Sequence, residues 1–134
     1  MSNVSLTCLI DDDEIFVYAM KKIINLKQLS REMITFDRVE KALDYFSINK
    51  NKAVLLPDVI LLDINLPGED GWDFIESFGQ ISDEMIKKPK IYMLSSSANP
   101  NDQQKALSNK NIENYYVKPL SKDDFKEIFG QWPA

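Results

Sequence analysis

Acidic side chains follow two apolar runs of the chain, at the positions where buried strands would end. The acidic run Asp11–Asp13 comes directly after Ile10, and Asp63 lies within the apolar run Val59–Ile64. Carboxylates on adjacent strands repel one another unless a cation lies between them. Because the sequence holds no histidine and a single cysteine, oxygen ligands and a hard divalent ion such as Mg²⁺ or Mn²⁺ are expected there.

A hydroxyl group and an ammonium group end two further apolar runs. Ser95 follows Leu94, and Lys118 lies between Val117 and Pro119. In an open parallel sheet the carboxyl ends of the strands meet at one edge, which is where sites form. A carboxylate, a cation, a lysine and a hydroxyl are the groups that phosphoryl transfer onto a carboxylate requires, because that chemistry depends on positioning and on neutralising charge.

Each of these residues alone also has a structural explanation. Asp13 or Glu14 can cap the helix that follows. Ser95 can start a turn, and Lys118 can be a solvated surface charge. Their combination at one edge of a sheet favours the functional interpretation.

Five short apolar runs alternate with amphipathic stretches, which predicts strands alternating with helices. The runs are Val4–Ile10, Met33–Phe36, Val59–Ile64, Ile91–Leu94 and Ile112–Val117. Apolar residues recur at helical spacing in the stretches between and after them: Ile15, Phe16, Ala19, Met20, Ile23 and Ile24; Val39, Ala42, Leu43 and Phe46; Phe74, Ile75 and Phe78; Ala106 and Leu107; Phe125, Ile128 and Phe129. This alternation predicts an α/β fold with a parallel sheet and helices on both of its faces.

Local signals place two helix starts and one loop. Ser121 begins a capping-box pattern that ends at Asp124. Asn99 before Pro100 is typical of an N-cap followed by proline at the first helical position. The stretch 49–57, rich in Asn and Lys, is predicted to be a loop.

The composition fits one compact domain and excludes several classes of function. With 134 residues, 44% hydrophobic and 28% charged, the chain has room for one domain and is not of disordered composition. Its 16 basic and 21 acidic residues give a net charge of −5, which argues against a nucleic-acid-binding surface. The lack of histidine excludes an imidazole base and a histidine metal ligand.

The remaining signals predict a cytoplasmic protein that does not associate with a membrane. Cys8 lies in an apolar run and is expected to be a buried core residue. The first residues lack the basic and apolar regions of a signal peptide. The apolar run Val59–Leu62 is far too short to cross a bilayer.

Four motifs, in this order and spacing, resemble the receiver domain of two-component response regulators, of the stand-alone type similar to the chemotaxis response regulator. The motifs are Leu9–Asp12, Asp58–Gly68 with Gly71, Leu94-Ser95, and Tyr115–Pro119. The resemblance covers residues 4–129 and implies a flavodoxin-like, doubly wound five-stranded parallel sheet of order 2-1-3-4-5, with five helices. Residues 130–134 would then form a short tail, with no output domain.

The resemblance also implies a role for each site residue. The phosphoacceptor would be Asp63. The metal ligands would be Asp11, Asp12, Asp63 and the backbone carbonyl of Asn65. The residues that stabilise the phosphoryl group and operate the switch would be Lys118, Ser95 and Tyr115. The structural positions would be Pro67, Gly68 and Pro119, the last following a cis peptide bond from Lys118.

By the same resemblance, the protein would be a signalling module and not a conventional enzyme. It would receive a phosphoryl group on Asp63 from a histidine kinase or a histidine phosphotransfer protein, with Mg²⁺ or Mn²⁺ bound. Phosphorylation would draw Ser95 inward, bury Tyr115 and change the surface of the fourth helix, fifth strand and fifth helix. The output would be protein binding or passage of the phosphoryl group along a phosphorelay, from a monomer or a weak phosphorylation-linked dimer.

Three other functions are to be weighed against this one. A receiver fold that no longer uses phosphorylation could serve as a constitutive interaction module. A Mg²⁺-dependent aspartyl phosphatase would need a second acid two residues after its nucleophile, a position that Asn65 occupies. A flavodoxin-type FMN site is disfavoured, because acids after the first strand would repel the phosphate of the cofactor.

Tryptophan and glycine residues outside the acidic edge are expected to be structural. Trp72 is expected to support the fold in preference to recognising a partner. Trp132, close to the end of the chain, could be a docking anchor, but is expected to be frayed. Gly68 and Gly71 are expected to give the loop beside the phosphoacceptor its backbone freedom.

Overall fold

The computed structural model describes residues 4–133 and contains within them a five-stranded sheet and five α-helices. The strands are β1 (Leu6–Ile10), β2 (Glu32–Phe36), β3 (Val59–Asp63), β4 (Lys90–Ser95) and β5 (Ile112–Val117). The helices are α1 (Glu14–Leu26), α2 (Val39–Ile48), α3 (Gly71–Ser82), α4 (Pro100–Ser108) and α5 (Lys122–Phe129), with one turn of 3₁₀ helix, η1 (Ala53–Leu55). Residue 134, the last of the expected tail, lies outside the described range.

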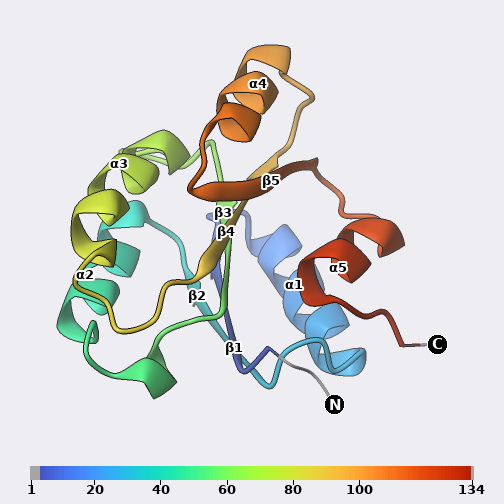
Figure 1. Ribbon diagram of the computed structural model, residues 1–134. Coiled ribbons are helices and arrows are strands. Elements are labelled where there is room, and N and C mark those ends of the chain that lie inside the picture. Colours follow the sequence, from blue (N-terminus) through green and yellow to red (C-terminus); the bar gives the residue numbers. More distant parts are fainter. Residues whose placement is uncertain (1–3, 134) are drawn as a thin grey trace.

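Neighbouring strands of the sheet all run parallel, in the order β2-β1-β3-β4-β5. Helices α1 and α5 lie on one side of the sheet and α2 and α3 on the other, with α4 close to β5 (Figure 1). This confirms the predicted doubly wound, flavodoxin-like fold. The strand order reverses between β1 and β3, so the crevice for a site is expected beyond their carboxyl ends.

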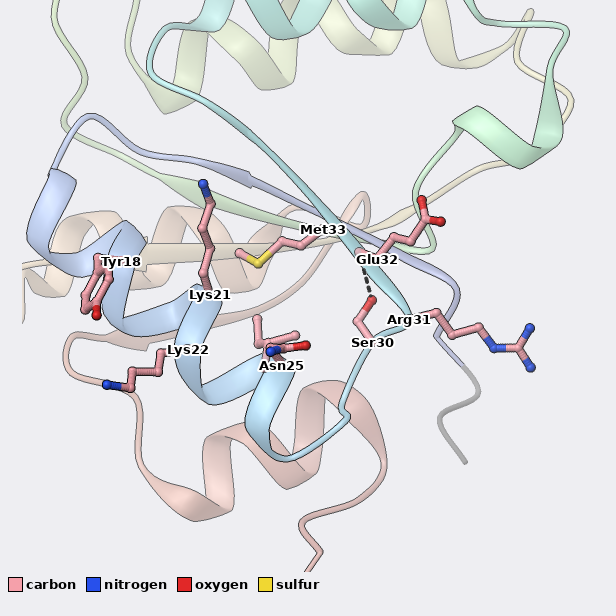
Figure 2. Close-up of a pocket in the computed structure, with 9 residues that line it drawn as sticks. Tyr18, Lys21, Lys22, Asn25, Ser30, Arg31, Glu32 and Met33 are labelled. Atoms are coloured by element: carbon pink, nitrogen blue, oxygen red, sulfur yellow. Dashed lines mark hydrogen bonds between the residues drawn. The ribbon is translucent and has the colours of Figure 1, made fainter.

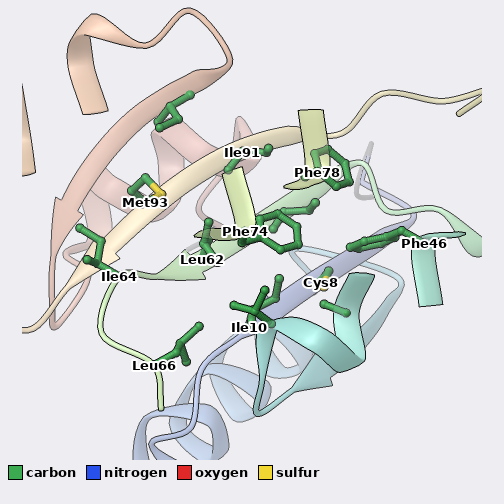
Figure 3. Packing of buried hydrophobic residues seen from close by; sticks show 14 of the residues in the cluster. Cys8, Ile10, Phe46, Leu62, Ile64, Leu66, Phe74, Phe78, Ile91 and Met93 are labelled. Atoms are coloured by element: carbon green, nitrogen blue, oxygen red, sulfur yellow. The ribbon is translucent and has the colours of Figure 1, made fainter. Parts of the chain in front are cut away.

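One core fills the space between the sheet and helices α2 and α3 (Figure 3). Alternate strand residues enter it because successive side chains of a strand point to opposite faces. The sheet and the helices contribute, among others, Cys8, Ile10, Leu62, Met93, Phe46, Phe74 and Phe78. Phe46 and Phe78 meet edge to face, with ring centroids 5.5 Å apart, an arrangement that aromatic pairs favour.

Cys8 is fully buried in this core, as predicted. Burial raises the pKa of its thiol far above the usual range, because the low-dielectric interior disfavours the thiolate. The thiol is therefore a small apolar group and not a nucleophile.

A second core lies on the opposite face, beneath α1 and α5. Its members include Leu9, Leu61, Tyr92 and Tyr116 from the sheet and Met20, Ile24, Phe125 and Ile128 from the helices. Helix α1 turns Met20 and Ile24 inward, whereas Ile15, which the spacing assigned to the same stripe, is 83% exposed. Spacing alone does not separate the centre of an apolar stripe from its margin, since adjacent helical residues differ by about 100°.

The prediction that Trp132 is frayed is wrong. Its ring packs on Phe125 of α5, with centroids 5.3 Å apart, and the ammonium of Lys27 lies 5.3 Å from the ring centroid. Gly130 ends α5 with a left-handed φ of 73°, which glycine adopts without strain. This turn directs the following residues back onto the second core.

The predicted helix starts are confirmed, and the predicted loop contains one short helical turn. Ser121 and Asp124 form the reciprocal capping box of α5, and Asn99 caps α4 with Pro100 in its first turn. Within the stretch 49–57, η1 forms a single turn of 3₁₀ helix.

Candidate functional site

Three carboxylates converge where β1 and β3 end. Asp11 and Asp63 are buried, Asp12 is exposed, and one oxygen of each lies within 4.8 Å of the others. The register of the sheet causes this convergence, because Ile10 pairs with Leu62, Asp11 directly follows β1, and Asp63 is the last residue of β3. Oxygen donors at this spacing are typical of a site for a hard divalent cation.

The third acid of the run has a different role. The carboxylate of Asp13 caps α1 by accepting the backbone N–H groups of Ile15 and Phe16, at 3.1 and 3.2 Å. Its own N–H donates to Asp11 Oδ1 at 2.9 Å. The acids closest to Asp63 are therefore Asp11 and Asp12, the pair that the sequence predicted, and Asp13 anchors the helix instead.

Lys118 brings a positive charge into contact with two of the acids. Its Nζ lies 2.6 Å from Asp11 Oδ2 and 3.3 Å from Asp63 Oδ1, and its side chain is only 11% exposed. The backbone N–H of Lys118 donates to the carbonyl of Ser95 at 2.8 Å, which ties the end of β5 to the end of β4. The Lys118–Pro119 peptide bond is cis.

The carboxyl group of Asp63 is the acid whose charge this site disfavours. Burial and the neighbouring charge of Asp11 raise its pKa to about 6, in spite of the opposing attraction of Lys118. Asp12 contributes further repulsion. One ammonium group does not balance three carboxylates, so additional positive charge would stabilise the ionised cluster.

Ser95 and Tyr115 meet at a backbone carbonyl and not at the acids. Ser95 Oγ donates to the carbonyl of Ser97 at 2.8 Å, and Tyr115 Oη donates to the same carbonyl at 3.1 Å. Tyr115 is already buried, with 7% exposure. We expected phosphorylation to bury this tyrosine. In this structure the tyrosine already lies inward while Ser95 is bonded to the loop after β4.

The loop between β3 and α3 passes close to the acids. Asn65 and Pro67 are exposed, and Gly68 has a left-handed φ of 75°, consistent with its predicted role. Gly71 is required for a different reason from the predicted one. A Cβ there would lie 2.7 Å from the carbonyl oxygen of Asp63, so Gly71 provides space and not backbone freedom.

Two hollows flank α1 and β2. One, of about 610 Å³, opens beside Asp11 and Asp12 and is also lined by the cations Arg38 and Lys41. The other, of about 470 Å³, lies between α1 and the start of β2, where Lys21, Lys22 and Arg31 point in different directions (Figure 2). Only the first hollow combines access from solvent with the acidic site.

Two features of the site did not follow from the sequence patterns. The ring of Phe16, assigned only to an apolar stripe, lies 4.3 Å from Lys118 Nζ. The carbonyl of Ser97 links Ser95 to Tyr115, and a backbone acceptor leaves no signal in side-chain identity. The sequence signal that could have suggested the contact of Phe16 with Lys118 is that Phe16 lies three residues after the acidic run Asp11–Asp13.

The chain matches the response regulator receiver domain over residues 7–129, and it belongs to this family. Over 95 residues it is 32% identical to the probable methanogenesis regulatory protein FilR2 of Methanothrix harundinacea (strain 6Ac), which covers 68% of this chain and 59% of that protein. The chain therefore spans less than two thirds of that relative's length. A receiver domain is a signalling module and not a conventional enzyme.

Solved structures of response regulators have the same fold. A two-component response regulator from Cytophaga hutchinsonii is 31% identical, with a TM-score of 0.83 over 93% of both chains. The Mn²⁺-bound form of response regulator Rcp1 has a TM-score of 0.71 at 22% identity, over 97% of this chain and 99% of that one, a likeness of fold alone. Across residues 4–133, no helix is both long enough and apolar enough to span a bilayer.

Proposed function

We propose that Asp63 accepts a phosphoryl group from a phosphohistidine of a partner histidine kinase or phosphotransfer protein in the cytoplasm. The observation that carries this proposal is the contact of one buried ammonium group, Lys118, with Asp11 and Asp63 at the carboxyl edge of the sheet. An acidic residue at this edge can have a purely structural role if it caps a helix, as Asp13 does. Asp63 caps none of the helices in residues 4–133, and it ends the central strand β3.

The transfer requires little covalent chemistry from the protein. An oxygen of Asp63 attacks phosphorus while the P–N bond of the donor breaks, and the bonding electron pair returns to the imidazole nitrogen. Lys118 would donate to one oxygen of the transferred group. The hydroxyl of Ser95 would leave the Ser97 carbonyl and donate to another oxygen of that group. Later attack of water on phosphorus releases inorganic phosphate and restores the carboxylate.

Asp11, Asp12 and Asp63 would hold a divalent ion, Mg²⁺ or Mn²⁺, together with the backbone carbonyl of Asn65. The three carboxylates fit such an ion, because one oxygen of each lies within 4.8 Å of the others and one ammonium leaves their charge unbalanced. The Mn²⁺ held by the structurally similar Rcp1 supports this assignment. When bound, the ion would neutralise negative charge on the transferring group.

The output would pass through the loop after β4. Withdrawal of Ser95 Oγ from the Ser97 carbonyl would remove one of the three hydrogen bonds that this carbonyl accepts, leaving those from Tyr115 Oη and from the backbone N–H of Asn99. The surface of α4, β5 and α5 would change with the loop. It would then bind another protein, form a weak dimer, or allow the phosphoryl group to pass along a relay.

One observation favours a second candidate function, a phosphorylation-independent interaction module. Tyr115 is buried and donates a hydrogen bond to the Ser97 carbonyl, so contacts within the fold already hold this part of the surface. If this arrangement already presents the binding surface, phosphorylation is not needed to create it.

Intact-mass analysis after incubation with acetyl phosphate separates the two candidates. Phosphorylation predicts a Mg²⁺-dependent gain of one phosphoryl group that is absent in Asp63→Asn. A folded protein that binds Mg²⁺ but gains no mass, and does not respond to beryllofluoride, would contradict the proposal and favour the interaction module.

A further inference from the structure

We infer that Phe16 is a positioning residue for Lys118, an inference that rests on the proposed phosphorylation of Asp63. The ring centroid of Phe16 lies 4.3 Å from Lys118 Nζ. An ammonium within about 6 Å of an aromatic face is attracted by the negative charge of that face, and more strongly so when both are shielded from water. The side chain of Lys118 is 11% exposed, so this contact is largely shielded.

The ring and the ammonium are anchored independently of each other. Phe16 is held by the Asp13 cap, which accepts its backbone N–H, and by packing on the second core. Lys118 is held at the end of β5 by its backbone bond to Ser95. The contact therefore joins α1 to the ends of β4 and β5 beside Asp63. The aromatic ring is fixed, whereas the aliphatic part of the lysine side chain is flexible.

The contact acts on the one group of the site that must change partners. In this structure Lys118 bonds Asp11 and Asp63, whereas in the proposed reaction it must donate to an oxygen of a group attached to Asp63. Because Nζ already lies 3.3 Å from Asp63 Oδ1, it can reach such a group without leaving the ring. Phe16 would thus confine Lys118 to the acidic cluster and keep water from its ammonium group.

The test compares aromatic and aliphatic residues at position 16. Phe16→Leu keeps an apolar helix former but removes the aromatic face, and Phe16→Tyr retains it. We expect Phe16→Leu to lower the acetyl phosphate rate constant and the beryllofluoride affinity about three- to tenfold, and Phe16→Tyr to stay within about twofold of wild type. Mg²⁺ affinity should stay within about twofold in both, because the ring of Phe16 lies over the ammonium of Lys118 and the acids proposed to hold the ion are unchanged.

Two controls separate positioning from a loss of packing. Phe125→Leu removes a ring from the same core without touching Lys118, and it should leave the phosphorylation rate within about twofold of wild type. Phenylalanine with one, two or three fluorines at position 16 weakens the aromatic face at nearly constant shape, so the rate should fall stepwise with fluorine number.

The outcomes are distinct for the inference and for the proposed function. An unchanged rate in Phe16→Leu and across the fluorinated series, with normal phosphorylation of wild type, would overturn the inference alone. Equal losses in Phe16→Leu and Phe125→Leu would also overturn it, because general packing would then explain both. Failure of wild type itself to gain a phosphoryl group would overturn the proposed function, and the role of Phe16 with it.

Discussion

Asp63 carries an ionisable group whose charged form is less stable in the folded protein than in the unfolded chain. Its pKa is raised from 3.8 to about 6, by burial first and then by the charge of Asp11. Below about pH 3 the group is protonated in both the folded and the unfolded states. As the pH rises toward 6 the unfolded chain ionises first, so the free energy of unfolding falls by about 3 kcal/mol, at 1.36 kcal/mol per unit of pKa.

Asp63→Asn should therefore stabilise the protein in a pH-dependent way when EDTA is present. The gain should reach about 3 kcal/mol at pH 8 and disappear below about pH 3, because asparagine does not titrate. Urea unfolding of both proteins across this range measures it. A difference between the two proteins that does not vary with pH would show that the Asp63 carboxyl is not perturbed in the folded state.

Thr7 is a second residue whose burial has an energetic cost. Its hydroxyl is fully buried and has no hydrogen-bond partner among the described residues. Thr7→Val removes the hydroxyl with little change of shape, and we expect it to raise the free energy of unfolding by about 1 kcal/mol. Thr35→Val, at a partly exposed position on the edge strand β2, is the matched control and should change stability by less than about 0.5 kcal/mol. Destabilisation by Thr7→Val would refute this account.

Secondary structure elements determine how closely the backbones at the site approach one another. Helix α3 begins at Gly71, whose N–H donates to the carbonyl of Ile64 at 2.8 Å. A Cβ on Gly71 would lie 2.7 Å from the Asp63 carbonyl oxygen and 2.9 Å from Ile64 Cα. Both neighbours are backbone atoms, so the contact cannot be relieved by a change of rotamer.

Two alanine substitutions in α3 test this close approach. Gly71→Ala should destabilise the protein by about 1–3 kcal/mol and displace Asp63, because backbone must move to admit the methyl group. Gly79→Ala, in the same helix with nothing within 4 Å of its Cβ position, should stabilise it by about 0.5–1 kcal/mol through helix propensity. Thermal unfolding of the two variants compares them directly, and equal effects would refute the steric argument.

The elements of the fold could be predicted from the sequence more fully than the contacts between them. β3 and β4 are apolar along most of their length because both of their faces are covered, and Ser121 and Asn99 marked helix starts through local hydrogen bonding. The convergence of the acids could also be predicted, because the carboxyl ends of parallel strands meet at one edge of the sheet. The packing of Trp132 and the ring of Phe16 over Lys118 did not, because they depend on side chains that meet only after the helices dock.

At the scale of the whole molecule, α3 and α4 are joined by a tryptophan. Trp72 Nε1 donates to Asp102 Oδ1 at 3.3 Å, and Lys105 Nζ lies 4.3 Å from the Trp72 ring centroid. Both partners are on α4, which follows the loop that carries Ser97. Trp72 thus has the structural role predicted for it, and its surroundings depend on the position of α4.

Trp72 should therefore report a change at the acidic site. Addition of beryllofluoride with Mg²⁺ should alter tryptophan fluorescence in wild type and in Trp132→Phe, whose ring packs on α5 instead. The same addition should leave Trp72→Phe nearly silent. A signal that is lost in Trp132→Phe and kept in Trp72→Phe would contradict coupling of the site to α4.

We expect Asp63, and no other acid of the cluster, to carry the phosphoryl group. Borohydride reduction of the protein treated with acetyl phosphate and Mg²⁺ would convert a phosphorylated aspartate to homoserine, and peptide mass analysis would locate it. Homoserine is expected at position 63. Homoserine at position 11 or 12 instead, or at none of the three in a folded, Mg²⁺-binding protein, would contradict it.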